Sequence, residues 1–309
     1  MRLPHLLLLP LLLAALPCLP VQAKAKPPAP KRTALIGIFE PSDDPANPPD
    51  LVVVAACIGG KRWAETEEAE GLVPKGDRLP LYTLTDGQVG EAAITGDGAL
   101  DSATVVSYAA VGLRYPATAT PLRGREKEYQ NAVAGGPTGS GQPLLAVWHA
   151  PGSPAPKWVT ARELSTENTV YRKVISDWLK AKGISQEVIA TVVVGQILQA
   201  DVNSDKRDEV ILAFRTSNTP ANEWRPRPTK SNFSYLVMRY VPHGSRKPRT
   251  VVLDDTTHVE KRVIGLCDLD SDGWAELVSE VGGLDIWGVQ LHHWVGDRFN
   301  TVLGCGAGC

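Results

Sequence analysis

The sequence predicts an all-β protein built from stacked four-stranded antiparallel repeats. Two nonapeptides with carboxylates at alternate positions, residues 201–209 and 268–276, lie 67 residues apart, each between two apolar, β-branched runs. Two more strand-like runs joined by a turn follow each nonapeptide, so that each copy contains four strands. One such sheet cannot bury both of its faces alone, and we therefore expect the copies to stack.

The chain begins with a pattern typical of a signal peptide, residues 1–23. Arg2 supplies the positive end, residues 6–16 the apolar stretch, and residues 21–23 the small-residue cleavage site. We therefore expect an exported protein, secreted, periplasmic or held at the cell surface. Residues 24–32 are rich in Pro and Lys and are expected to form a disordered spacer.

Composition limits the classes of partner. The 309 residues carry a formal charge of -2, and this balance favours neither a nucleic-acid nor an anionic-membrane partner. No run after the leader has the length of a membrane-spanning helix. The length suits one large all-β domain or two small ones, and we assign residues 33–309 to a single domain.

Four cysteines follow the leader, and export would place them where disulfides persist. They allow three pairings. Cys305 and Cys309 can close a local, glycine-rich loop, or the C-terminal repeats can be tied to Cys57. The four are Cys57, Cys267, Cys305 and Cys309.

The first part of the domain, residues 33–160, is interpreted as two eroded repeats. The earlier one keeps Asp50 at the last position of the nonapeptide, but Ser42 stands at its first position. The later one keeps Asp97-Gly-x-x-Asp101, a spacing equally typical of a Gly-rich turn. Residues 115–143, rich in Gly, Pro and charge, are expected to form a long surface loop.

One helix is predicted over residues 165–183, as an insertion into the repeat array. Thr166 is expected to cap its start, and Gly183 suits the position just past its end. We expect it to pack on the side of the stack or to cover an open edge. Its apolar face contains Val170, Tyr171, Val174, Ile175, Trp178 and Leu179.

The C-terminal part, residues 188–309, contains the two clear repeats, and its second nonapeptide has the composition of a calcium loop. Carboxylates stand at positions one, three, five and nine, with Gly273 at position six. Calcium prefers six to eight oxygen ligands, and alternate carboxylates on a tight loop can converge on one ion. Trp274, at position seven, would contribute its backbone carbonyl. The four carboxylates are Asp268, Asp270, Asp272 and Glu276.

The first nonapeptide offers a weaker set of ligands. Its side-chain candidates are three carboxylates and one amide, and Arg207 would contribute a backbone carbonyl. Lys206 takes the place of the glycine, where a positive φ strains any residue with a side chain. We expect this loop to bind calcium less tightly than the second. The four side chains are Asp201, Asn203, Asp205 and Glu209.

These residues resemble the calcium loops of FG-GAP/VCBS repeats, whose pattern is D-x-[DN]-x-D-G-x-x-D before a strand. The resemblance covers about the last 120 residues. It implies a β-propeller-like stack, for which the mature chain suffices for about four or five blades or an incomplete ring. It also implies one or two structural Ca²⁺ ions and an extracellular protein or carbohydrate ligand. An EF-hand is excluded because position twelve is Leu212 or Ser279 and a strand follows each loop.

No nucleophile elbow or H-E-x-x-H motif is found. His292 and His293 are adjacent in a predicted strand, so they should point to opposite faces. The first hypothesis is therefore a calcium-binding repeat protein with a structural or recognition role. The alternative is an exported glycan-active hydrolase or lyase that uses the loops only as structural staples.

Overall fold

The computed structural model describes residues 33–42, 49–59, 62–64, 69–105, 108–135, 142–216, 229–255, 260–282 and 286–308. The described residues are mostly in strands, with few helices, which confirms the all-β class. The predicted leader, residues 1–23, and spacer, residues 24–32, lie outside the described residues. No helix within those residues has the length and apolarity needed to cross a membrane.

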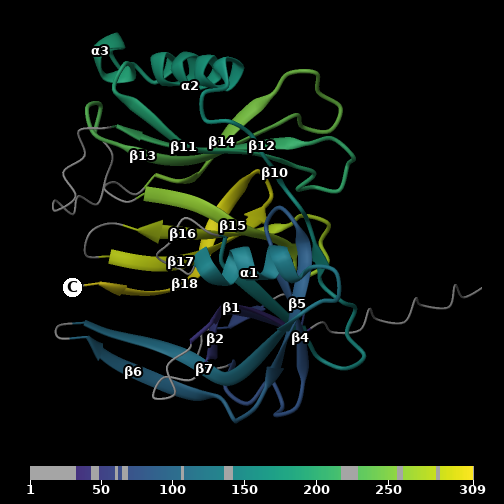
Figure 1. Cartoon of the computed structure of the whole chain (residues 1–309). Helices are drawn as coiled ribbons and strands as arrows, with labels where there is room; N and C mark the ends of the chain where they lie inside the picture. Colours follow the sequence, from purple (N-terminus) through teal and green to yellow (C-terminus); the bar gives the residue numbers. More distant parts are fainter. Residues whose placement is uncertain are drawn as a thin grey trace, which may run out of the picture.

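The first part of the chain forms a closed six-stranded antiparallel barrel (Figure 1). Its core contains Leu35, Leu51, Leu79 and Tyr115, all fully buried. The strands run around the barrel in the order β2 (Asp50–Ile58), β1 (Ala34–Glu40), β8 (Leu144–His149), β4 (Arg78–Thr83), β5 (Gly87–Ile94) and β7 (Tyr108–Pro121), and β7 pairs back to β2. Strands β3 (Arg62–Ala64) and β6 (Ala99–Val105) add to β2 and β7.

This barrel differs from the two eroded four-stranded repeats expected over residues 33–160. The reason is the length of β7, whose residues 114–116 pair with β2 while residues 117–121 pair with β5. One long strand thereby joins two neighbours and closes the sheet. Helix α1 (Glu126–Gly135) follows β7 and buries Tyr129 and Ala132 in the barrel core. The expectation of a long surface loop over residues 115–143 was therefore wrong.

Each of the two clear repeats contributes four consecutive antiparallel strands, as the sequence predicts, to a five-stranded sheet. Repeat A comprises β11 (Val192–Ala200), β12 (Glu209–Thr216), β13 (Ser234–Tyr240) and β14 (Arg249–Asp254). Repeat B comprises β15 (Glu260–Asp268), β16 (Glu276–Gly282), β17 (Ile286–Val295) and β18 (Arg298–Gly308). Two short strands precede them, and β9 (Lys157–Trp158) pairs with β15 while β10 (Arg162–Glu163) pairs with β11.

The repeats stack head to tail. Ile211 of repeat A packs toward repeat B, and its equivalent Val278 packs toward the barrel. On the opposite faces, Val210 packs toward helix α2 (Thr169–Ala181), and its equivalent Leu277 packs toward repeat A. The order of layers is therefore α2, repeat A, repeat B and barrel, as Figure 1 shows from top to bottom. The expected stacking of the copies is confirmed.

The stack differs from the predicted four or five blades. In the described residues two four-stranded repeats are present, and their outer faces are covered by α2 and by the barrel. A ring of blades requires both outer faces to meet further blades, and here both are already buried. The part of the chain that the structure describes is thus a capped two-repeat stack joined to a barrel.

Helix α2 confirms the predicted insertion and its packing. Ile175 and Leu179 are buried against the α2-side face of repeat A. The cap is Asn168 rather than Thr166, because its side chain accepts hydrogen bonds from the N–H groups of residues 170 and 171 at 3.1 and 3.4 Å. Gly183 has φ +76°, as expected just beyond the end. Helices α1 and α3 (Gln186–Ile189) were not predicted.

The cysteine pairings remain predictions. Cys57 and Cys267 are both buried, and no disulfide bond joins cysteines within the part of the chain that the structure describes. Cys309 and the side chain of Cys305 lie outside the described residues.

Candidate metal centre

The second nonapeptide, which we call loop B (residues 268–276), turns sharply between β15 and β16. Ser271 has φ 66° and Gly273 has φ 93°, which produces the tight turn expected at this glycine. Each of the three aspartates of the loop accepts a hydrogen bond from a backbone N–H further along the loop. The N–H of Asp272 donates to Asp270 at 3.0 Å, and that of Trp274 donates to Asp272 at 2.7 Å. These bonds orient the side chains toward the inside of the turn.

Three of the predicted ligands converge. Asp268, Asp270 and Asp272 each offer a carboxylate oxygen, and these oxygens lie within 4.8 Å of one another. Asp268 is buried, the side chain of Asp270 is mostly buried and Asp272 is exposed, so the group opens to solvent on one side. This is the arrangement that the alternation of carboxylates predicts.

Glu276, the fourth carboxylate, is fully buried at the start of β16. One of its oxygens, Oε2, accepts a hydrogen bond of 2.7 Å from the N–H of Leu269, which fixes the closing end of the loop to its beginning. Its other oxygen, Oε1, lies 3.0 Å from Nδ1 of His293 on β17.

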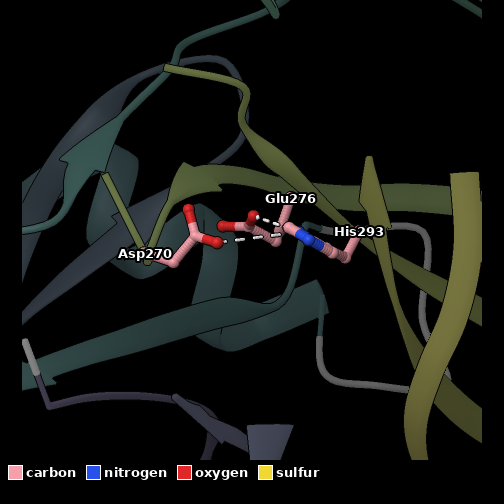
Figure 2. A group of neighbouring side chains, drawn as sticks. All are labelled: Asp270, Glu276 and His293. Atoms are coloured by element: carbon pink, nitrogen blue, oxygen red, sulfur yellow. Dashed lines mark hydrogen bonds and ion pairs between the residues drawn. The ribbon is translucent and has the colours of Figure 1, made fainter. Parts of the chain in front are cut away.

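His293 was not among the predicted site residues, yet it belongs to a second group of possible ligands. Figure 2 shows its ring directed at Asp270 and Glu276. Its Nδ1 lies 3.9 Å from Oδ2 of Asp270. As predicted, His292 and His293 point in different directions, since His292 contacts Ser279 and His293 contacts Glu276.

Burial and the crowding of carboxylates shift the pKa values of the ionisable groups in and beside loop B. Burial, and then the charge of Asp272, raise the pKa of Asp270. Burial raises the pKa of Glu276 to about 7. The hydrogen bond to Glu276 raises the pKa of His293. Among the described residues, His293 is the one ion-pair partner of Asp270 and Glu276.

The first nonapeptide, loop A (residues 201–209), has the same backbone conformation at its turn as loop B. Ser204 and Lys206 have φ 59° and 68°, at the positions equivalent to Ser271 and Gly273. Lys206 therefore adopts the left-handed backbone conformation expected at this position, which is strained for any residue with a side chain. Glu209 repeats the bond of Glu276, since its Oε2 accepts from the N–H of Val202 at 2.9 Å.

The side chains of loop A are engaged differently. Arg207 pairs with Asp205 at 2.5 Å, and Nδ2 of Asn203 donates to Oε1 of Glu209 at 3.2 Å. The carboxylates of Asp201, Asp205 and Glu209 do not form a group of ligands like that of loop B among the described residues. Burial raises the pKa of Glu209 to about 7.

A pocket of about 520 Å³ lies beside loop A, where β9 and β10 cross from the barrel to the repeats. Asp201 and Asp208 line it together with Lys157 and Arg162. Oδ1 of Asp201 is buried without a hydrogen-bond partner. The pocket is polar and wide open, and its lining includes no histidine.

A second histidine contact lies deeper in repeat B. Nε2 of His292 is 2.7 Å from Oγ of Ser279, and its Nδ1 is 3.1 Å from Oγ1 of Thr301. Ser279 and His292 are both fully buried, so this serine is not accessible to a substrate. The contact satisfies buried polar atoms within the sheet.

The two loops touch each other. The N–H of Ala275 in loop B donates a 2.7 Å hydrogen bond to the carbonyl of Val202 in loop A. Next to it, the ring of Trp274 stacks on Trp294 at 4.2 Å.

Comparisons of the chain with protein-family models, with curated proteins and with solved structures gave no match.

Proposed function

We propose that this is an exported calcium-binding repeat protein, in which an ion at loop B fixes the corner between β15 and β16. The observation that carries the proposal is the convergence of Asp268, Asp270 and Asp272 within 4.8 Å, beside a buried Glu276. Like charges at this separation repel one another, and burial increases the cost. A divalent cation would offset both.

The donor set fits calcium, a hard cation that prefers oxygen ligands. The groups that would hold it are the side chains of Asp268, Asp270, Asp272 and Glu276 and the backbone carbonyl of Trp274. When bound, the ion would supply positive charge and rigidity to the turn. The protein residues orient the carboxylates through the backbone hydrogen bonds of the loop.

Loop A would bind a second ion more weakly. The guanidinium of Arg207 already neutralises Asp205 at 2.5 Å. Asn203 directs its amide nitrogen, which is not a ligand, at Glu209. An ion at loop A would have to compete with both contacts, so loop B should fill first.

The role of the bound ions would be structural, in a protein that recognises a ligand outside the cell. Binding to the folded state alone raises its stability by mass action, about 2.7 kcal/mol at a concentration of one hundred times Kd. The recognition role depends on the resemblance to FG-GAP/VCBS repeats, which implies a protein or carbohydrate ligand by analogy of fold.

Calorimetric titration of the EDTA-treated mature protein, residues 24–309, with Ca²⁺ tests the proposal. We expect one tight site, which the double substitution Asp270→Asn/Asp272→Asn removes, and a weaker second site. Asp297→Asn, in the exposed turn between β17 and β18, is the matched control and should leave the titration unchanged. A wild-type protein that takes up no Ca²⁺ would refute the proposal.

A further inference from the structure

We propose that His293 makes loop B a mixed nitrogen–oxygen site for a first-row transition-metal cation such as Zn²⁺, with Asp270 and Glu276 as the other ligands. This inference rests on the proposed function in one respect, that loop B binds a divalent cation. It goes further by naming the class of cation and a ligand that lies outside the nonapeptide.

Geometry supports the assignment. Nδ1 of His293 lies 3.0 Å from Oε1 of Glu276 and 3.9 Å from Oδ2 of Asp270, and the ligand atoms of all three residues lie within 4.8 Å of one another. Ligands about 2.0–2.2 Å from a zinc ion are separated from one another by roughly 3–4 Å. The three atoms can therefore bind one ion after small adjustments (Figure 2).

The charge of the three side chains also favours a bound divalent cation. The side chain of Asp270 is 9% exposed and that of Glu276 is fully buried. In the described part of the chain, no lysine or arginine pairs with either carboxylate. When ionised, two mostly buried carboxylates that face one imidazole carry more negative than positive charge, which is costly in a protein interior. A divalent ion would supply the missing charge.

Repeat A provides an internal comparison. In register, the residue equivalent to His293 is Tyr240, since Arg239 faces Val210 as His292 faces Leu277. The residue equivalent to Asp270 is Asn203, whose amide donates to Glu209 as His293 contacts Glu276. Loop A therefore satisfies its glutamate without any nitrogen that can ligate a metal. Imidazole favours zinc and related ions over calcium, so the two loops should differ in the cation they prefer.

The decisive variant is His293→Gln, because glutamine can still donate a hydrogen bond to Glu276, as Asn203 does in loop A, but its amide nitrogen is not a metal ligand. The matched control is His243→Gln, which removes an exposed imidazole on the turn between β13 and β14. Each protein is stripped with EDTA and titrated separately with Zn²⁺ and Ca²⁺ by calorimetry. Circular dichroism in EDTA establishes that each variant is folded.

We expect the wild-type and His243→Gln proteins to bind Zn²⁺ with equal affinity. His293→Gln should weaken Zn²⁺ binding at least about tenfold, the lower end of the losses seen even for residues that only support a ligand. Its Ca²⁺ affinity should stay within about twofold, because oxygen ligands dominate calcium binding. In the wild-type protein, Co²⁺ should also give a paramagnetically shifted imidazole N–H signal, absent in His293→Gln.

The outcomes separate the two proposals. If Zn²⁺ binds equally well to wild type and His293→Gln, the histidine is not a ligand and this inference fails, whatever Ca²⁺ does. If Zn²⁺ binding depends on His293 but Ca²⁺ does not bind at all, the mixed site stands and the proposed calcium function falls. If neither cation binds, both fail.

Discussion

The backbone N–H of Ala275 donates a 2.7 Å hydrogen bond to the carbonyl of Val202, and this bond joins the two acidic loops directly. Ala275 precedes Glu276, and Val202 donates its own N–H to Glu209. The contact therefore lies next to the last glutamate of each loop: Ala275 is joined to Glu276 by a peptide bond, and Val202 is joined to Glu209 by a hydrogen bond. The contact between the two loops is therefore made by backbone atoms on both sides.

Neutralising Asp270 should lower thermal stability in calcium but not in EDTA. Asp270→Asn removes one ligand, so the stabilisation by bound ion, about 2.7 kcal/mol at one hundred times Kd, should largely disappear. In EDTA the same change removes a repelling charge and should leave the melting temperature nearly unchanged. Thermal unfolding in the two buffers, with Asp297→Asn as control, measures this. Equal losses in both buffers would show that Asp270 acts without a metal.

Gln196→Met should loosen the contact between the repeats. The side chain of Gln196 accepts from the N–H of Val263 at 2.8 Å and donates to its carbonyl at 3.1 Å, in a buried position. Methionine would leave both groups unsatisfied, at about 1–3 kcal/mol each. Urea unfolding measures the loss. Gln290→Met is the control and should cost less, because Oε1 of Gln290 already lacks a partner.

Gly265→Ala should strain the junction between repeat B and the barrel. A Cβ there would overlap Cδ1 of Leu145 and lie 3.0 Å from the ring of Trp158. Overpacking of this kind costs about 1–3 kcal/mol. Gly282→Ala, at the end of β16, meets nothing within 4 Å and is the matched control. If urea unfolding gives the same stability for both variants, the tight junction is refuted.

Stability should depend on pH through Lys261. Burial lowers the pKa of Lys261 to about 8 from 10.5, against the opposing effect of Asp254, which lies 3.1 Å away. The folded state then binds fewer protons than the unfolded state between these values, so the free energy of unfolding should rise as pH increases from 8. The slope contributed by one group is at most about 1.4 kcal/mol per pH unit.

The measurement is urea unfolding of wild type, Lys261→Met and Lys247→Met between pH 7 and 9.5. Lys247 is exposed, so its substitution should keep the wild-type slope. Lys261→Met should lose the rise above pH 8, and should also cost about 3–5 kcal/mol at pH 7 by breaking the buried ion pair with Asp254. A slope identical in all three proteins would contradict a lowered pKa for Lys261.

The repeats were predictable because their signals are local. Alternating carboxylates and a positive-φ position lie within nine residues, and the turns of loops A and B follow that pattern. The face of α2 is equally local, and Ile175 and Leu179 are buried as its spacing predicts. Its cap was misplaced by two residues because Thr166 and Asn168 are both suitable capping residues.

The barrel and His293 depend on pairing between distant segments. Nothing within β7 shows that its two halves meet β2 and β5, whose paired residues are at least 23 positions away in the chain. The contact of His293 with Glu276 requires the register of β16 against β17, which depends on the connection between them. The alternation of β17 predicts which face His293 occupies but not which residue it meets there.

Head-to-tail stacking has a consequence for how such a chain can lengthen. The side of repeat A that faces repeat B differs from the side that faces α2, and repeat B has the same polarity. A duplicated repeat inserted between repeats A and B would meet a complementary face on each of its two sides. A repeat added beyond either end would have to displace helix α2 or the barrel. This architecture can therefore gain repeats in evolution only between repeats A and B.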